Sequence, residues 1–183
     1  MHKLGVPGPD SFDDDEIEHV HAAVYQVENG RRLRAGVPYG SPVSFETLTL
    51  SLTPPYMLLY VLHTTHGEAE RGRYQSPDLS KAEFQSFIHR FGSYLGSDAR
   101  FDIWARSQAD DATVVWDRHN FLYAYGLIES FKKTLNTLGF VEGEIEALGG
   151  HVHHYRTECD NDARAMIQAF DWIVTPLQPQ DEQ

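Results

Sequence analysis

Residues 101–125 read FDIWARSQADDATVVWDRHNFLYAY and contain three short runs rich in aromatic and β-branched side chains. Such side chains favour extended backbone, so we expect strands at 101–107, 113–117 and 121–125. The connections between these strands are short. Because a parallel pair of strands needs a crossover of about a dozen or more residues, the three runs predict an antiparallel meander.

The segments before and after this meander complete a predicted α+β domain. Ser80 and Glu83 have the spacing of a capping box and begin the best-specified helix. Gly139 and Phe140 fit a Schellman ending of a second helix. We therefore expect an antiparallel sheet of about five to six strands with helices mainly on one face. The other expected strands are 43–52, 56–64 and 151–156, and the expected helices are 81–95, 127–138 and one that begins at Asp160 and ends before Pro176.

The N-terminal part of the chain is expected to form a helical arm. Residues 11–30 follow a helical pattern in which Ser11 caps the start, and Asn29 with Gly30 ends it. The residues after this helix are rich in Gly and Pro and favour an irregular connection. The predicted division is a helical arm with its linker over residues 1–42, docked on the main body, a single α+β domain over 43–177 and a frayed tail over 178–183.

The composition indicates an acidic protein. Fifteen Lys and Arg face 27 Asp and Glu, which gives a formal net charge of −12. Phosphate contacts need Lys and Arg, so this balance argues against nucleic acid and anionic membrane surfaces as partners. The longest apolar run, 56–62, is far shorter than the ~20 residues that cross a bilayer, so we expect no membrane anchoring. The single cysteine, Cys159, excludes an intrachain disulfide and favours a cytoplasmic protein.

Histidine is the unusual residue of this sequence, with ten copies. His151 and His153 lie two positions apart on a predicted strand, so both imidazoles face the same side and can form the base of a metal site. His63 and His66, at the end of an earlier strand, can add ligands, and zinc would be the ion. No established zinc spacing occurs, however. The alternative is that these histidines are polar strand-edge residues with hydrogen-bonded neighbours.

The turn at residues 116–120 concentrates polar groups between two apolar strands. Asp117 and His119 can orient one another as a general acid and base, and His119 is a further candidate metal ligand. The alternative is that Asp117 is an ordinary turn former. Cys159 precedes a predicted helix, where a thiol can become nucleophilic, but an inert thiol is the better interpretation of one isolated cysteine.

Two functions of different classes follow from these patterns. Trp104 and Trp172 fall out of phase with the apolar faces of their elements, and aromatic side chains outside a core often mark interfaces. We favour a small acidic cytoplasmic module that binds a basic protein partner, or pairs as a homodimer through Trp172 and the last helix. The alternative is a zinc-dependent or histidine-based acid/base enzyme that uses the histidine cluster.

Overall fold

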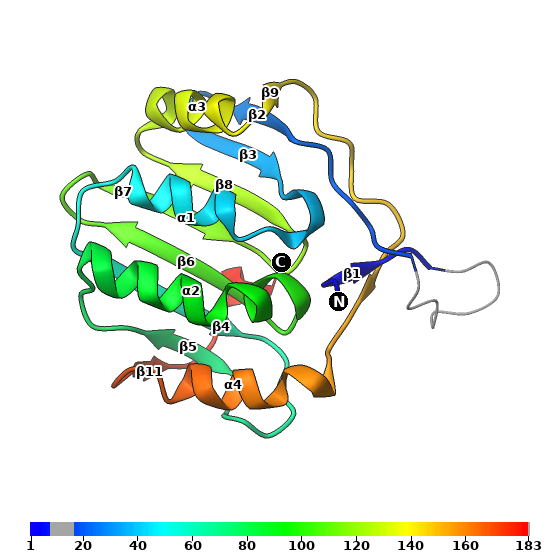
Figure 1. Ribbon diagram of the computed structural model, residues 1–183, viewed down its shortest axis with the longest axis vertical. Helices are drawn as coiled ribbons and strands as arrows, with labels where there is room; N and C mark the ends of the chain where they lie inside the picture. The colour runs from blue at the N-terminus through cyan, green and yellow to red at the C-terminus, as the bar shows by residue number, and fades with distance from the viewer. Residues whose placement is uncertain (8–16, 183) are drawn as a thin grey trace.

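The computed structural model describes residues 1–7 and 17–182, and one large sheet organises it (Figure 1). The strands are β1 (Leu4–Gly5), β2 (Val24–Glu28), β3 (Arg32–Gly36), β4 (Tyr56–Leu62), β5 (Gly72–Gln75), β6 (Phe101–Ser107), β7 (Ala112–Trp116), β8 (Phe121–Tyr125), β9 (Val141–Glu142), β10 (Val152–His153) and β11 (Ile173–Thr175). The α-helices are α1 (Val43–Leu50), α2 (Lys81–Ser97), α3 (Ile128–Thr137) and α4 (Asp160–Ile167).

Nine strands of the described chain form a mixed sheet in the order β11-β5-β4-β6-β7-β8-β3-β2-β9, and β1 pairs with β10 in a second sheet. The expected antiparallel sheet of five to six strands is therefore wrong, because the large sheet has nine strands and its β2–β9 pair is parallel. The edge strands β9 and β11 are two and three residues long, too short to leave an alternating pattern in the sequence.

The predicted meander is confirmed at the centre of this sheet. Strands β6, β7 and β8 pair in sequence, antiparallel, and Ile103 of β6 lies opposite Trp116 of β7. Alternate side chains of a strand point to opposite faces. Phe101, Ile103 and Ala105 accordingly belong to the buried core, while Trp104 points away from it.

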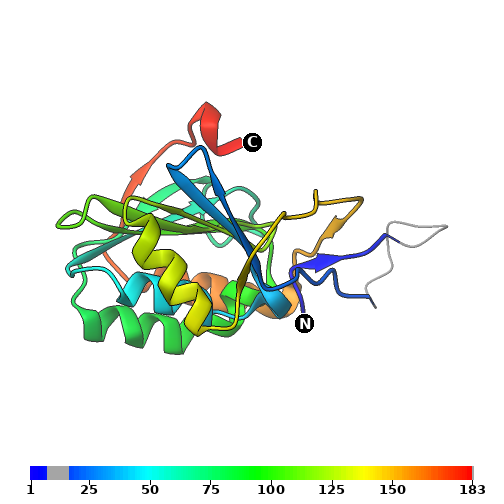
Figure 2. The same cartoon turned by 90° about the horizontal axis from the view of Figure 1, so that it is seen from above.

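The four helices lie on one side of the large sheet, and the C-terminal segment lies on the other side (Figure 2). The capping box that begins α2 is confirmed, because the Ser80 side chain accepts from the Glu83 backbone and the Glu83 side chain accepts from the Ser80 backbone. The Schellman ending of α3 is confirmed as well, since the Phe140 amide donates to the Leu135 carbonyl at 3.0 Å. We call the side without helices the open face.

The expectation of a helical arm at the N-terminus is wrong for residues 17–30, the part of the expected helix that the structure describes. Residues 11–16 lie outside the described residues, and residues 17–30 contain no helix but include strand β2. Asn29 and Gly30, which the helical interpretation places at a helix end, form with Arg31 the turn of the β2–β3 hairpin and have φ of 52° and 66°. Asn-Gly with two positive φ values is the strongest short-range signal of a hairpin.

Two further segments differ from the expected secondary structure. Residues 43–50, expected as a strand, form α1, which buries Phe45, Leu48 and Thr49 at helical spacing against the core. The last helix ends at Ile167, and residues 173–175 form β11, which pairs with β5. Among residues 1–7 and 17–182, no helix is both long and apolar enough to cross a membrane.

Candidate metal centre

Three histidines meet where the β7–β8 turn approaches the small sheet. His119 comes from the turn, His151 directly precedes β10, and His153 ends β10. One ring nitrogen of each lies within 4.8 Å of the others. The ring centroids are 5.3 Å apart for His119 and His151, 4.8 Å for His119 and His153, and 5.0 Å for His151 and His153. We call these residues the His119 cluster.

Backbone pairing positions the two late histidines. The small sheet places His153 opposite Leu4. The next residue continues this attachment, since the His154 amide donates to the Lys3 carbonyl at 2.9 Å, and the His154 carbonyl accepts from the Ala99 amide at 3.0 Å. Ala99 lies just before β6, so this bond fixes the small sheet to the end of the large sheet that carries the β7–β8 turn.

The turn that carries His119 is fixed by one carboxylate. Asp117 Oδ1 accepts from the backbone amides of His119 at 2.9 Å and Phe121 at 2.8 Å. The Lys3 ammonium donates to the Asp117 carbonyl at 3.2 Å. Because Lys3 adjoins β1, which pairs with β10, this contact connects the two halves of the cluster.

Each imidazole of the cluster has an oxygen next to its Nδ1 atom. Nδ1 of His119 lies 3.3 Å from Asp117 Oδ2, and Nδ1 of His151 lies 2.9 Å from the Gly149 carbonyl. Nδ1 of His153 lies 3.5 Å from the Tyr155 hydroxyl. Metal-bound histidines in proteins almost always engage their second ring nitrogen in this way, which fixes the tautomer and the ring orientation.

The Nε2 atoms are the ones left for a ligand. Nε2 of His153 is buried without a hydrogen-bond partner among the described residues. Zinc bonds to imidazole nitrogen are about 2.0–2.1 Å long, so an ion would draw the three nitrogens closer together than they lie now. Small rotations of the rings about their outer side-chain torsion, which is broad for histidine, can supply this movement.

The electrostatic environment keeps His153 neutral. Burial, followed by the positive charge on His119, His151 and Arg118, lowers the pKa of His153 from 6.5 to about 3, although Asp102 opposes the shift. A neutral imidazole is the form that binds a metal ion. His153 is therefore in its ligand form at any pH at which the protein is ordinarily handled.

An open cleft of about 360 Å³ adjoins the cluster. It is lined by His63, Thr64, Arg71, Arg118, His119, His153 and Tyr155. His63 Nε2 lies 2.9 Å from Asp102 Oδ2, and Asp102 Oδ1 accepts from the Arg118 amide at 2.8 Å. His63 thus faces the same cleft as His119 and His153, but a carboxylate holds one of its nitrogens.

His66 lies in a different site, the ionic network around Arg100. Its Nδ1 lies 2.9 Å from Asp160 Oδ1. The Arg100 side chain is fully buried and donates to Asp98, Glu68 and Asp160 at 2.8–3.0 Å. The structure therefore separates His66 from the His119 cluster and assigns it to a network that packs the β4–β5 loop against the start of α4.

The other candidate residues fall in structural surroundings. The carboxylate of Asp117 holds two backbone amides as well as His119, so its geometry is that of a positioning residue. Cys159 is buried, and burial together with Asp98 raises the pKa of its thiol to about 11. Trp104 lies on the open face. Trp172 lies between α4 and β11, where its ring is 5.1 Å from that of Phe170.

Sequence reasoning missed two residues that support the cluster. Tyr155 continues the two-residue period of His151 and His153, so the alternation of an extended chain is the signal that would have identified it. No sequence signal could have identified the carbonyl of Gly149, because every residue has a backbone carbonyl. Comparisons of this chain with known protein families, with curated proteins and with solved structures give no match.

Proposed function

We propose that this protein is a metal-dependent enzyme that binds one zinc ion through Nε2 of His119, His151 and His153. The observation that carries the proposal is the convergence of the three imidazoles, with one ring nitrogen of each within 4.8 Å of the others and an oxygen beside each Nδ1. Three imidazoles suit zinc, copper, nickel or iron, and zinc is the ion most often held by three histidines with an open position.

The adjoining cleft supports a catalytic rather than a structural site. Structural zinc has four protein ligands, whereas catalytic zinc keeps one position for water or substrate. The described residues supply three imidazoles, and the cleft beside them gives a substrate access. A zinc ion lowers the pKa of a bound water to about 7, so we propose hydrolysis or hydration of a small substrate as the reaction class.

His63 is the residue we propose for proton transfer in this reaction. It lines the cleft, and the Asp102 carboxylate at 2.9 Å orients its ring. A histidine oriented by a carboxylate is a common general base, because the pair fixes the tautomer and stabilises the protonated ring. Asp102 thus acts as a positioning residue. Burial raises its pKa, but the hydrogen bonds and charges of His63 and Arg118 together lower it more, so the pKa of Asp102 lies below its ordinary value.

Metal analysis of protein purified without a polyhistidine tag tests the site. We expect about one equivalent of zinc, and its loss in His151→Gln and His153→Gln. His66→Gln and the exposed His89→Gln remove a histidine elsewhere and should retain the ion. Wild-type protein that holds less than about a tenth of an equivalent after incubation with zinc and dialysis would reject the proposal.

A homodimer is the second candidate, and the edge strand β11 supports it. Ile173 and Val174 are 62% and 54% exposed, and β11 ends the strand order of the large sheet. An exposed apolar edge strand is a template for pairing with another chain. The homodimer proposed here uses β11 rather than Trp172 and the last helix, since Trp172 packs against the core. The basic protein partner remains a proposal from composition alone.

A further inference from the structure

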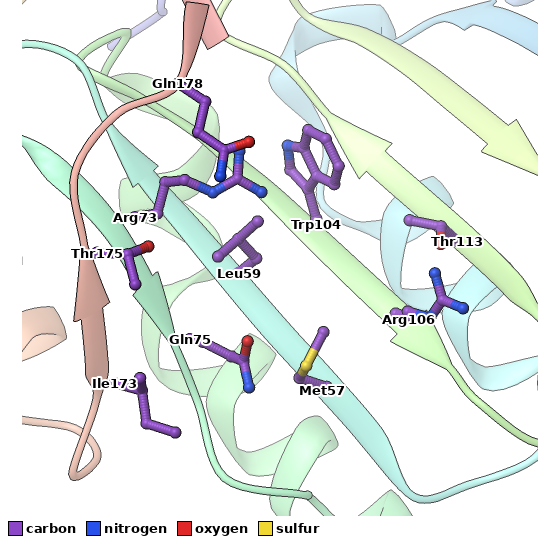
Figure 3. A pocket seen from close by; sticks show the side chains of 10 residues that line it. All are labelled: Met57, Leu59, Arg73, Gln75, Trp104, Arg106, Thr113, Ile173, Thr175 and Gln178. Atoms are coloured by element: carbon purple, nitrogen blue, oxygen red, sulfur yellow. The ribbon is translucent and has the colours of Figure 1, made fainter. Parts of the chain in front are cut away.

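A second hollow, separate from the histidine cleft, lies on the open face of the large sheet. It has a volume of about 320 Å³, within the usual range for sites that bind small molecules. Strands β4, β5, β6 and β11 surround it, and it shares no lining residue with the histidine cleft. Figure 3 shows its lining residues, which are Met57, Leu59, Arg73, Gln75, Trp104, Arg106, Thr113, Ile173, Thr175 and Gln178.

The floor of this open-face pocket is apolar. Met57 and Leu59 of β4 alternate with Leu58 and Tyr60, which belong to the core on the helix side. Because alternate side chains face opposite sides, Met57 and Leu59 point into the pocket. Trp104 of the neighbouring strand adds an indole ring, so a hydrocarbon group gains burial here without disturbing the core.

Hydrogen-bond donors gather at one end of the pocket. Figure 3 shows Arg73, Gln178 and Trp104 close together there, while Ile173 and Met57 lie toward the other end. The amide oxygen of Gln178 accepts from the amide of Gln180, which leaves the Gln178 nitrogen as a donor. The indole nitrogen of Trp104 has no hydrogen-bond partner among the described residues.

The Arg73 guanidinium is fixed before any ligand arrives. Its Nη1 donates to Asp181 Oδ1 at 2.5 Å, and the Asp181 side chain is 1% exposed. Asp181 Oδ2 also accepts from the Gln178 amide at 2.7 Å. A guanidinium has five N–H donors, so the remaining ones can serve an anion, and a guanidinium held in place loses less entropy when it binds.

The residue types of the lining favour an anion over a cation. Arg73 and Arg106 line the pocket, and no acidic residue does. Arg106 donates at 2.8 Å to Asp111, which lies outside the lining of the pocket. The adjacent hollow on the same face contrasts with it, because four carboxylates, Asp102, Asp111, Asp117 and Asp181, offset three arginines there. Each arginine pairs with a carboxylate outside the lining, so what the pocket offers an anion is the remaining N–H donors of the two guanidinium groups.

We propose that the open-face pocket binds a small organic carboxylate with an apolar tail. The carboxylate occupies the end formed by Arg73, Gln178 and the Trp104 nitrogen, because charge-assisted hydrogen bonds from a guanidinium suit this group. The tail lies over Leu59 and Met57 toward Ile173. The proposal is independent of the metal centre, since the two sites have no residue in common.

Calorimetric titration of the full chain with octanoate tests this site, with octanamide, acetate and octyl phosphate as comparisons. We expect saturable octanoate binding that is about tenfold or more tighter than binding of octanamide or acetate. Arg73→Gln should weaken octanoate binding by about tenfold or more, whereas the exposed Arg31→Gln should leave it unchanged. The indole N–H resonance of Trp104, assigned by its loss in Trp104→Phe, should shift on titration.

Several outcomes would overturn the proposal. Equal affinity for octanoate and octanamide would mean that only the apolar floor binds, and tighter binding of octyl phosphate would replace the carboxylate by a phosphate. No saturable heat, or an unmoved Trp104 resonance, would remove the site. Should Arg73→Gln fail to fold, Met57→Glu places a like charge on the floor and must abolish octanoate binding. Metal-loaded and metal-depleted protein should behave alike.

Discussion

The ammonium group of Lys3 lies inside the protein, whereas most lysine ammonium groups lie at the surface. Its side chain is fully buried, its Nζ lies 4.2 Å from the centroid of a Trp116 ring, and it donates to the Asp117 carbonyl. Burial lowers the pKa of Lys3 from 10.5 to about 8, although Asp117, Asp102 and Asp98 oppose the shift. The cation–π contact and the carbonyl compensate only part of the lost hydration.

This pKa predicts how stability depends on pH. Between about pH 8 and 10.5 the unfolded chain holds a proton on Lys3 that the folded protein has released, so the free energy of unfolding rises with pH there. We expect a gain of roughly 2 kcal/mol between about pH 7 and pH 9.5 in urea unfolding. Lys3→Met should remove this gain, and an identical pH slope in the two proteins would contradict the prediction.

The Cys159 thiol should be unreactive. Burial raises its pKa to about 11, so the thiolate that attacks electrophiles is scarce at neutral pH. Labelling with a thiol reagent should be slow in native protein and fast in denaturant. Rapid labelling of the native protein at neutral pH would show that the thiol is exposed or ionised and would return Cys159 to the candidate nucleophiles.

Asp117 should affect metal affinity without touching the ion. Asp117→Ala removes the oxygen beside Nδ1 of His119 and frees the two backbone amides of the turn. Loss of such an outer partner typically weakens metal binding by about 10- to 100-fold. Zinc competition with a chromogenic chelator measures this, and the exposed Asp78→Asn is the matched control. Unchanged affinity in Asp117→Ala would count against the cluster as the zinc site.

At the scale of elements, the Arg100 network joins parts that share no hydrogen-bonded ladder. Arg100 directly precedes β6. Its side chain binds Asp98, which follows α2, Glu68 in the β4–β5 loop and Asp160 at the start of α4. Three of these charged side chains, Arg100, Asp98 and Glu68, are buried, which is tolerated because each has partners. Removing the cation alone leaves the buried carboxylates of Asp98 and Glu68 without an oppositely charged partner in this network.

Arg100→Met should therefore destabilise the protein strongly. We expect a loss of about 3–5 kcal/mol in the free energy of unfolding, the usual cost of breaking a buried ion pair on one side. Chemical denaturation measures it. His66→Gln alters the half-exposed margin of the same network and should cost far less. Similar losses in the two variants would mean that the centre of the network is not Arg100.

The sequence predicts the elements that carry a strong local signal. Strands β6 to β8 and helices α2 and α3 have alternation, caps or both, and the structure confirms them. The β2–β3 hairpin was missed because Val24 and Val27 also fit a helical stripe, although Asn29 and Gly30 carried the correct signal. The pairing of β2 with β9 and of β1 with β10 joins distant residues, and local patterns contain no information on such pairs.

The same distinction holds for the candidate site. The shared face of His151 and His153 follows from their two-residue spacing, and His119 was a candidate by type. That His119 joins them, while His63 and His66 pair with separate carboxylates, depends on tertiary packing alone. Residue type thus gave the candidate ligands, and only the folded structure shows which of them lie together.

At the scale of the whole molecule, β11 predicts self-association. A net charge of −12 makes two copies repel each other, and salt screens this repulsion. We expect light scattering to detect a dimer whose share rises with salt, and Val174→Lys on β11 to abolish it. Val141→Lys, on the opposite edge strand β9, is the control. A strict monomer at high salt and concentration would reject the dimer.

The pairing of β1 with β10 also has a consequence for biosynthesis. His153 is held opposite Leu4, so the imidazoles reach their arrangement only when the ribosome has released residues from both ends of this span. Nascent chains that stop earlier have the early histidine but no partners for it. Such chains lack two of the three imidazoles, so the complete site for an ion forms only after residue 153 has left the ribosome.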